Sequence, residues 1–199
     1  MTVHMLLMRT YPVQRGTVLL VHAAAGGLGT MLTRWAKQLG CTVIGTAGSP
    51  EKAEIASANG ADYVIVGRDA DIVAEVSQLT SGRGVDFAID GIGGEVLRKT
   101  FECVRRFGMI ASIGQAAGPI PAISVEDLGP VRSLSLARPS VMAYAAEQDT
   151  YRLAASAVVD AIGKGIIPDA PFAYPLAEAA KVQRALETGE TTGSLVLVP

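Results

Sequence analysis

Apolar residues along this chain occur in short unbroken runs rather than alternating one by one with polar residues. Val18–Val21 is the first such run, and comparable stretches recur at roughly even spacing through the chain. Continuous apolar runs are typical of strands that are buried on both faces, as in parallel sheets. The pattern predicts strands at residues 18–21, 42–46, 63–66, 86–90, 109–113, 133–137 and 194–198.

Segments with helical character separate these runs, and several have recognisable ends. Gly40 follows one of them at the position where a left-handed residue often ends a helix. Ser49, Pro50 and Glu51 suit the start of the next one, as N-cap, first-turn proline and acid facing the helix dipole. The sequence predicts helices at 2–8, 27–39, 49–60, 69–79, 96–104, 149–163 and 176–187, with irregular chain at 114–130 and 165–175.

The order of these elements predicts the fold class. Strands that alternate with helices of about 10 to 15 residues imply right-handed crossovers and a parallel sheet with helices on both faces. Residues 17–66 and 85–137 each approach a βαβαβ unit. We therefore expect an α/β fold, a Rossmann doubly wound parallel sheet of about six strands, with a ligand crevice at the carboxyl ends of the strands.

Composition narrows the class of protein further. Hydrophobic residues make up 49% of the chain and charged residues 18%, which is typical of a folded globular protein. A net charge of −2 gives no indication of a nucleic-acid or anionic-membrane partner. Cys41 and Cys103 form no metal motif, and no apolar run approaches the ~20 residues of a membrane span. We expect a cytoplasmic protein, because unpaired thiols suit a reducing compartment.

The stretch VHAAAGGLGT, residues 21–30, joins the first strand to the helix that follows it. In the dinucleotide-binding pattern G-x-G-x-x-G, Gly26 and Gly29 occupy the second and third glycine positions, and Ala24 replaces the first. Gly26 would let the backbone approach a pyrophosphate, and Gly29 would let the helix pack closely on the strand. The turn predicts a dinucleotide site at the helix start; glycine used only for tight packing is the alternative.

The end of the second strand bears on the choice of cofactor. An NAD-selective site places Asp or Glu there to bind the ribose 2′-hydroxyl. This chain has Ala47, Gly48 and Ser49 at that point, and Glu51 lies in the first turn of the helix that follows. An extra 2′-phosphate would meet small residues and the ammonium of Lys52, so the sequence favours NADPH over NADH. The alternative role for Lys52 is that of a solvated lysine on the helix surface. The missing acid also argues against a methyltransferase that binds S-adenosylmethionine.

The sequence contains no convincing catalytic group. No Tyr has a Lys four residues later, and there is no Walker A or G-x-S-x-G motif. His4 and His22 lack a metal-ligand spacing, and we interpret His22 as a core histidine. Asp90 ends the fourth strand, either as a functional carboxylate or as an acceptor for backbone N–H groups. The catalytic residues therefore stay unassigned, and we predict no metal site. Hydride transfer is compatible with this, because the cofactor carries that chemistry.

Six segments together resemble the NADPH:quinone oxidoreductases, the zinc-free, zeta-crystallin-like branch of the medium-chain dehydrogenase/reductase superfamily. They are VHAAAGGLG, QLGCTVIGTAGSPEKAEIA, NGADYVI, VDFAIDGIGG, ARPS and TTGSLVLVP. They occur in this order over nearly the whole chain. The resemblance implies hydride transfer from NADPH to a quinone or conjugated carbonyl. An enoyl-thioester reductase of the same superfamily, a non-catalytic NADP(H)-binding module and a fragment that binds nothing are the alternatives.

The resemblance also implies which residues bind the cofactor. It places the pyrophosphate on Gly27 and Leu28, beside Gly26 and Gly29. It places the adenosine phosphate on Gly48, Ser49 and Lys52, and the nicotinamide end near two further groups: Ile113, Gly114 and Gln115, and Arg138, Pro139 and Ser140. A Tyr and an Arg that help to hold the 2′-phosphate in the family correspond to Gly67 and Gly189 here. A preference for NADPH would then depend mainly on Lys52 and backbone donors.

The family has a second domain, a GroES-like substrate domain, most of which precedes the nucleotide domain in the chain. By resemblance, residues 1–171 are a Rossmann domain with a lead-in helix, and residues 172–199 are a helix–strand remnant of the otherwise missing substrate domain. The resemblance further implies a homodimer formed through the sixth strand, residues 133–137, whose pattern suits an edge that pairs. An edge that the missing domain covers is the alternative. The expected partner is a small electron acceptor, a quinone, with no nucleic acid and no membrane.

Overall fold

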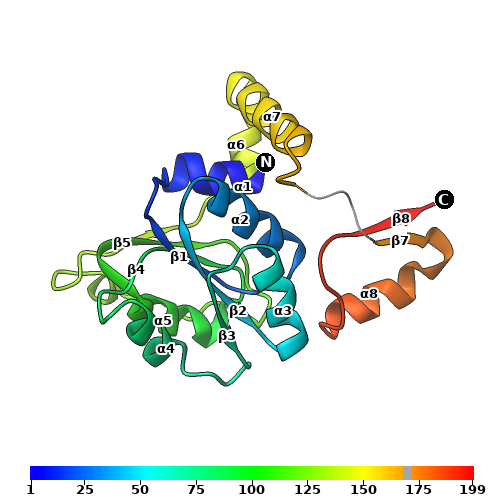
Figure 1. The fold of residues 1–199 in the computed structure, drawn as a ribbon. Helices are drawn as coiled ribbons and strands as arrows, with labels where there is room; N and C mark the ends of the chain where they lie inside the picture. The colour runs from blue at the N-terminus through cyan, green and yellow to red at the C-terminus, as the bar shows by residue number, and fades with distance from the viewer. Residues whose placement is uncertain (168–171) are drawn as a thin grey trace.

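Six parallel strands form the central sheet of the computed structural model, which describes residues 1–167 and 172–199 (Figure 1). Their order is β3-β2-β1-β4-β5-β6, and every neighbouring pair is parallel. They span Val18–Val21, Thr42–Ala47, Tyr63–Val66, Val85–Asp90, Val104–Ser112 and Ser135–Ala137, from β1 to β6. This order reverses direction between β1 and β4, as in doubly wound folds. The predicted fold class is confirmed.

Helices cover both faces of the sheet. α1 (Thr2–His4) continues into a π-helical segment, η1 (Met5–Thr10), and packs with α2 and α7, whereas α4 and α5 lie together on the opposite face (Figure 1). The remaining bounds are α2 Gly27–Gln38, α3 Pro50–Ala58, α4 Ile72–Leu79, α5 Gly94–Cys103, α6 Val141–Ala146 and α7 Gln148–Gly163. Among the described residues, no helix combines the length and the apolar composition needed to cross a bilayer.

The core consists of two apolar clusters, one on each face of the sheet. Leu19 and Val21 of β1 lie in the cluster that includes residues of α1 and α2, together with Phe87 of β4. Leu20 lies in the other cluster, which includes Leu97 of α5. All five side chains are at most 1% exposed. Successive strand residues point to opposite faces, so a strand covered on both sides needs an unbroken apolar run.

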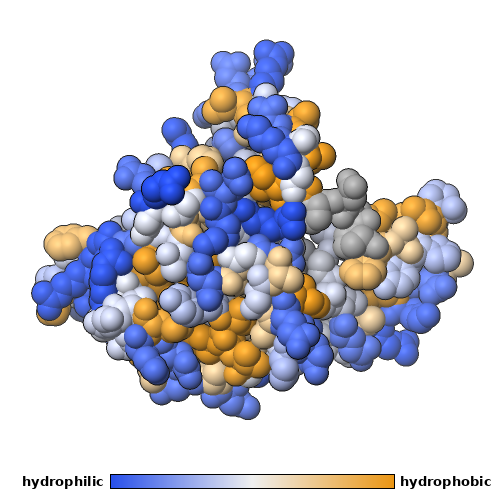
Figure 2. All heavy atoms as spheres, in the orientation of Figure 1, coloured by the Kyte–Doolittle hydropathy of each residue, from blue (hydrophilic) through white to orange (hydrophobic). Residues whose placement is uncertain are grey.

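The C-terminal part forms a small sheet of its own. β7 (Phe172–Pro175) pairs in parallel with β8 (Leu195–Val198), and the connection contains η3 (Leu176–Glu178) and α8 (Ala179–Glu187). Within the part of the chain that the structure describes, this sheet pairs with no strand of the central sheet. Figure 2 shows apolar side chains at the surface over this segment and over α7.

Several predicted elements were wrong in extent. The strand predicted at 109–113 is β5, which begins at Val104 and has a register shift against β4. The sixth strand is shorter than predicted, and α6 was not predicted. Part of the stretch predicted as irregular, 165–175, forms β7, and residues 168–171 of that stretch lie outside the described residues. The loop predicted at 114–130 contains one 3-10 turn, η2 (Val125–Asp127).

Candidate cofactor site

The turn between β1 and α2 is built from main chain. Gly26 is the N-cap of α2, and no side-chain hydrogen bond caps this helix end within the described residues. The N–H of Gly26 donates to the carbonyl oxygen of Ala23 at 2.9 Å, and the N–H of Thr30 donates to that of Gly26 at 2.8 Å. The N–H groups of a first helical turn have no intrahelical partner, so they attract an anion together with the helix dipole.

Backbone atoms limit the space around this turn. A Cβ atom on Gly29 would lie 2.3 Å from the carbonyl oxygen of Ala23, which is far inside van der Waals contact. A Cβ on Gly26 would lie 3.2 Å from the same oxygen, and Gly26 itself has an ordinary extended backbone with φ −75°. Gly29 is therefore explained by the close packing of α2 on the turn, as the sequence predicts.

A segment near the C-terminus lies directly on this turn. The N–H of Gly193 donates to the carbonyl oxygen of Ala25 at 3.1 Å, and Gly193 forms an isolated parallel bridge with Gly26. A Cβ on Gly27 would lie 3.0 Å from both the carbonyl oxygen of Gly193 and the hydroxyl of Ser194. Sequence reasoning did not name these two residues as part of the site, although the closing TTGSLVLVP was among the segments that carried the resemblance.

The end of β2 leads into α3 through Gly48 and Ser49. The hydroxyl of Ser49 accepts a hydrogen bond from the N–H of Lys52 at 3.4 Å, and Pro50 opens the helix, as the sequence predicts. Lys52 is half-buried, and its Nζ donates to the carbonyl oxygen of Gly189. The C-terminal segment thus contacts both the turn after β1 and the predicted phosphate-binding lysine.

The predicted nicotinamide-end residues follow β5 and β6 at the same edge of the sheet. Gly114 packs against the loop after β4, where a Cβ on it would lie 2.6 Å from the carbonyl oxygen of Gly91. Arg138 donates to the hydroxyl of Ser112, the last residue of β5, at 2.9 Å. The remaining predicted residues here are Ile113, Gln115, Pro139 and Ser140, and the Ser140 hydroxyl caps α6. Because all six strands are parallel, this edge also carries the turn after β1.

Buried polar side chains connect three strand ends beneath the turn. Nε2 of His22 lies 2.8 Å from the hydroxyl of Thr100, which donates to Asp90 at 2.8 Å. Nδ1 of His22 lies 3.3 Å from the hydroxyl of Thr46, which also accepts the N–H of Ala23. These contacts fit one neutral tautomer, with the proton on Nε2. Burial lowers the pKa of His22, and nearby Asp90 acts in the opposite direction.

Asp90 is completely buried at the end of β4. Its second carboxylate oxygen accepts the N–H groups of Ile92 and Gly93, each at 2.8 Å. The sequence left two roles open for Asp90, and the structure shows that it accepts hydrogen bonds from backbone N–H groups. The structure also confirms that His22 is a hydrogen-bonded core histidine.

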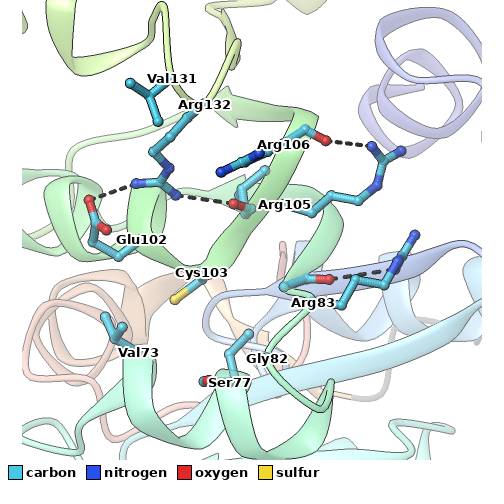
Figure 3. A pocket seen from close by; sticks show the side chains of 13 residues that line it. Val73, Ser77, Gly82, Arg83, Glu102, Cys103, Arg105, Arg106, Val131 and Arg132 are labelled. Carbon is cyan, nitrogen blue, oxygen red and sulfur yellow. Dashed lines mark hydrogen bonds and ion pairs between the residues drawn. The ribbon is translucent and has the colours of Figure 1, made fainter.

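A groove of about 610 Å³ lies elsewhere, at the amino ends of β4 and β5 (Figure 3). Three of its four arginines pair with carboxylates of the protein: Arg132 with Glu102, and Arg83 and Arg105 with Asp86. None of the predicted site residues lines it. In open parallel sheets ligands bind at the carboxyl ends of the strands, so we do not take this groove as the cofactor site.

The thiols of Cys41 and Cys103 also have to be considered as nucleophiles or metal ligands. Burial raises the pKa of the Cys41 thiol to about 11 and that of the Cys103 thiol to about 12. Both thiols are therefore protonated at neutral pH, and protonated thiols are poor nucleophiles and metal ligands. In residues 1–167 and 172–199, no three His, Cys, Asp or Glu side chains gather in a group that could hold a metal ion.

The strand order and the bare turn at the first crossover define a Rossmann-type α/β domain. Residues 27–160 match the family model described as zinc-binding dehydrogenase. The chain belongs to this family, within the medium-chain dehydrogenase/reductase superfamily, and the family resemblance predicted from the sequence is confirmed.

Similar proteins include reductases of known structure. A 2-haloacrylate reductase from Burkholderia sp is 38% identical over 201 residues, which cover 100% of this chain and 60% of that protein. The quinone oxidoreductase of Pseudomonas syringae pv. tomato DC3000 has a TM-score of 0.94 and 36% identity, over 100% of this chain and 61% of its own. The Escherichia coli quinone oxidoreductase complexed with NADPH has a TM-score of 0.93 and 33% identity, and the match covers 100% of this chain and 62% of the E. coli chain. The chain thus spans about 60% of the length of these relatives.

Proposed function

We propose that the chain is the NADPH-binding part of a reductase. The observation that carries the proposal is the uncapped start of α2, which follows a turn that has no side chain longer than a methyl group from Ala23 to Gly27. Main-chain N–H groups at such a helix start suit a pyrophosphate. The similar E. coli quinone oxidoreductase, whose structure contains NADPH, supports the choice of cofactor.

Each predicted residue has a role in this proposal. Gly27, Leu28 and Gly29 present the amides of the first helical turn to the pyrophosphate, and Gly26, whose own N–H donates to Ala23, leaves room for its approach. Gly48, Ser49 and Lys52 bind the adenosine phosphate. The loops after β5 and β6 orient the nicotinamide end, through Ile113, Gly114, Gln115, Arg138, Pro139 and Ser140. When bound, NADPH supplies a hydride. We assign no catalytic residue and no metal to the described part of the chain.

The proposed acceptor is a conjugated carbonyl compound, and a quinone is the first choice. The relatives reported above include quinone oxidoreductases and a 2-haloacrylate reductase, and both names describe reduction of a conjugated system. The latter favours a second candidate, an unsaturated acid or enoyl thioester. Steady-state assays with a quinone, 2-chloroacrylate and an enoyl thioester, on the longest reading frame that contains this chain, separate the two.

The proposal extends to the organisation of the protein. We assign residues 1–171 to the nucleotide-binding domain and residues 172–199 to a segment that belongs with a substrate domain. We propose a cytoplasmic homodimer that pairs through β6, because β6 is the last strand at one side of the sheet. No nucleic-acid or membrane partner is part of the proposal.

Calorimetric titration of the chain with NADPH tests the cofactor site directly. Gly26→Val should abolish measurable binding, because the side chain would occupy the space through which a pyrophosphate approaches the amides. The fold should survive, since φ −75° at this position suits any residue. A thermal melt of the variant is the control for folding. Unchanged NADPH affinity in a folded Gly26→Val protein would exclude the turn as the binding site.

A further inference from the structure

Arg68 lies where β3 ends, next to the end of β2. Gly67 turns the chain there with φ +113°, and its N–H donates to the carbonyl oxygen of Ala47 at 2.9 Å. A Cβ atom on Gly48 would lie 3.6 Å from Nε of Arg68. The guanidinium group therefore lies beside the bare residue that follows β2, at the carboxyl edge of the sheet.

A second cation reaches the same place. A Cβ on Gly189 would lie 3.4 Å from a terminal nitrogen of Arg68 and 4.0 Å from Nζ of Lys52. Both charges thus lie within 4.0 Å of one point, at which glycine leaves no side chain. Lys52 also donates to the carbonyl oxygen of Gly189, which holds its ammonium group in position.

These two cations lack an acidic partner in the part of the chain that the structure describes. No carboxylate oxygen there lies within 4.0 Å of Arg68 or Lys52. The arginines of the groove at the other edge of the sheet differ, because Arg83 and Arg105 each lie 2.5 Å from Asp86. Two neighbouring like charges without a counter-ion make a region of positive potential that favours a multivalent anion.

We propose that Arg68 is the principal residue that selects NADPH over NADH, by binding the 2′-phosphate together with Lys52. The inference rests on the proposed function. A guanidinium group binds phosphate through two parallel N–H donors, whereas an ammonium group acts as a point charge. Arg68 would then supply the side-chain contact that Gly67 and Gly189 cannot make, and selectivity does not depend on Lys52 alone.

The test compares dissociation constants for NADPH and NADH in the wild type and in Arg68→Gln, which keeps a polar, hydrogen-bonding side chain and removes its charge. We expect Arg68→Gln to bind NADPH about tenfold more weakly and NADH with unchanged affinity. Arg68→Lys should recover part of the loss. Arg152→Gln is the matched control, because Arg152 is an exposed arginine on α7, and it should change neither constant.

A second probe isolates the phosphate. Adenosine 2′,5′-bisphosphate should bind the wild type more tightly than adenosine 5′-monophosphate does, and Arg68→Gln should remove most of that difference. Equal losses for NADPH and NADH, or no loss for either, would overturn the role of Arg68 and leave the proposed function standing. A folded wild-type chain that binds neither dinucleotide would overturn the proposed function, and this inference with it.

Discussion

His22 lies at the end of β1, between the hydroxyl groups of Thr46 on β2 and Thr100 on α5. The residue is 8% exposed, and burial lowers its pKa. A lowered pKa means that protons bind more readily to the unfolded chain than to the folded one. Between the folded pKa and the unfolded value of about 6.5, stability therefore rises with pH.

Replacement of His22 should separate its contribution to the pH dependence of stability from the contributions of other titrating groups. We expect the unfolding free energy of the wild type to fall as the pH is lowered from 7.5 to 5.5. His22→Gln should have a shallower dependence, and it should be about 1–2 kcal/mol less stable at pH 7.5, because it loses buried hydrogen bonds. Urea denaturation at several pH values measures both effects. Parallel curves for the two proteins would show that His22 does not titrate on unfolding.

At the scale of elements, one carboxylate joins three parts of the sheet. Asp86, near the start of β4, accepts the N–H of Val18 on β1 at 2.8 Å and pairs with Arg83 and with Arg105 on β5. Burial alone would raise the pKa of Asp86, but these hydrogen bonds outweigh it and hold the pKa below its usual value. The resulting stabilisation is present above about pH 4 and is lost as the pH falls through the lowered pKa.

Asp86→Asn should therefore lower the unfolding free energy by about 2 kcal/mol at pH 7, because hydrogen bonds to a buried charge are lost. The difference from the wild type should shrink when both proteins are unfolded by urea at pH 3. Glu54→Gln, at an exposed position on α3, serves as the control and should change stability little. A difference that stays constant down to pH 3 would show that ionisation of Asp86 is not the cause.

The sequence predicted the elements whose local signals agree with their surroundings. The apolar runs of β1 to β4 and the start of α3 at Ser49 are examples. The early start of β5 was missed, because Arg105 and Arg106 give it a polar beginning. β7 was missed, because Pro175 suggested irregular chain and its partner β8 lies far along the sequence.

In the candidate site, too, features with a local signal could be predicted from the sequence, and contacts between distant residues could not. The turn after β1 could be predicted, because its glycines follow one another in the chain. The contact of Gly193 with Ala25 and the position of Arg68 beside Gly48 and Gly189 could not, because tertiary packing alone brings these residues together. Arg68 follows a residue that the resemblance had already singled out, Gly67, and that neighbour was the available signal.

At the scale of the whole molecule, β6 is one of the two edge strands of the central sheet in the described part of the chain, and β3 is the other. β6 pairs with β5 from Ser135 to Ala137, which leaves its outer side as an unpaired edge. Such edges pair with other chains unless charge or a covering element prevents it. Our proposal of a dimer through β6 uses this edge.

Light scattering with size-exclusion chromatography tests the proposal. The wild type should have the mass of a dimer, and Ser135→Lys should shift it to a monomer, because charge on an exposed edge position opposes strand pairing. Ser156→Lys on α7 is a control with the same change away from the edge. A monomeric wild type, or a dimer that survives Ser135→Lys, would contradict pairing through β6.

The hydrogen bond from Gly193 to Ala25 joins the small C-terminal sheet to the start of α2. A dinucleotide that bound at the first turn of α2 and shifted this contact would alter how firmly the sheet is held. By thermodynamic reciprocity, anything that docks on β7 and β8 would then change the dinucleotide's affinity by the same factor. Nucleotide binding at the start of α2 and docking on β7 and β8 would then be two coupled steps of a single equilibrium.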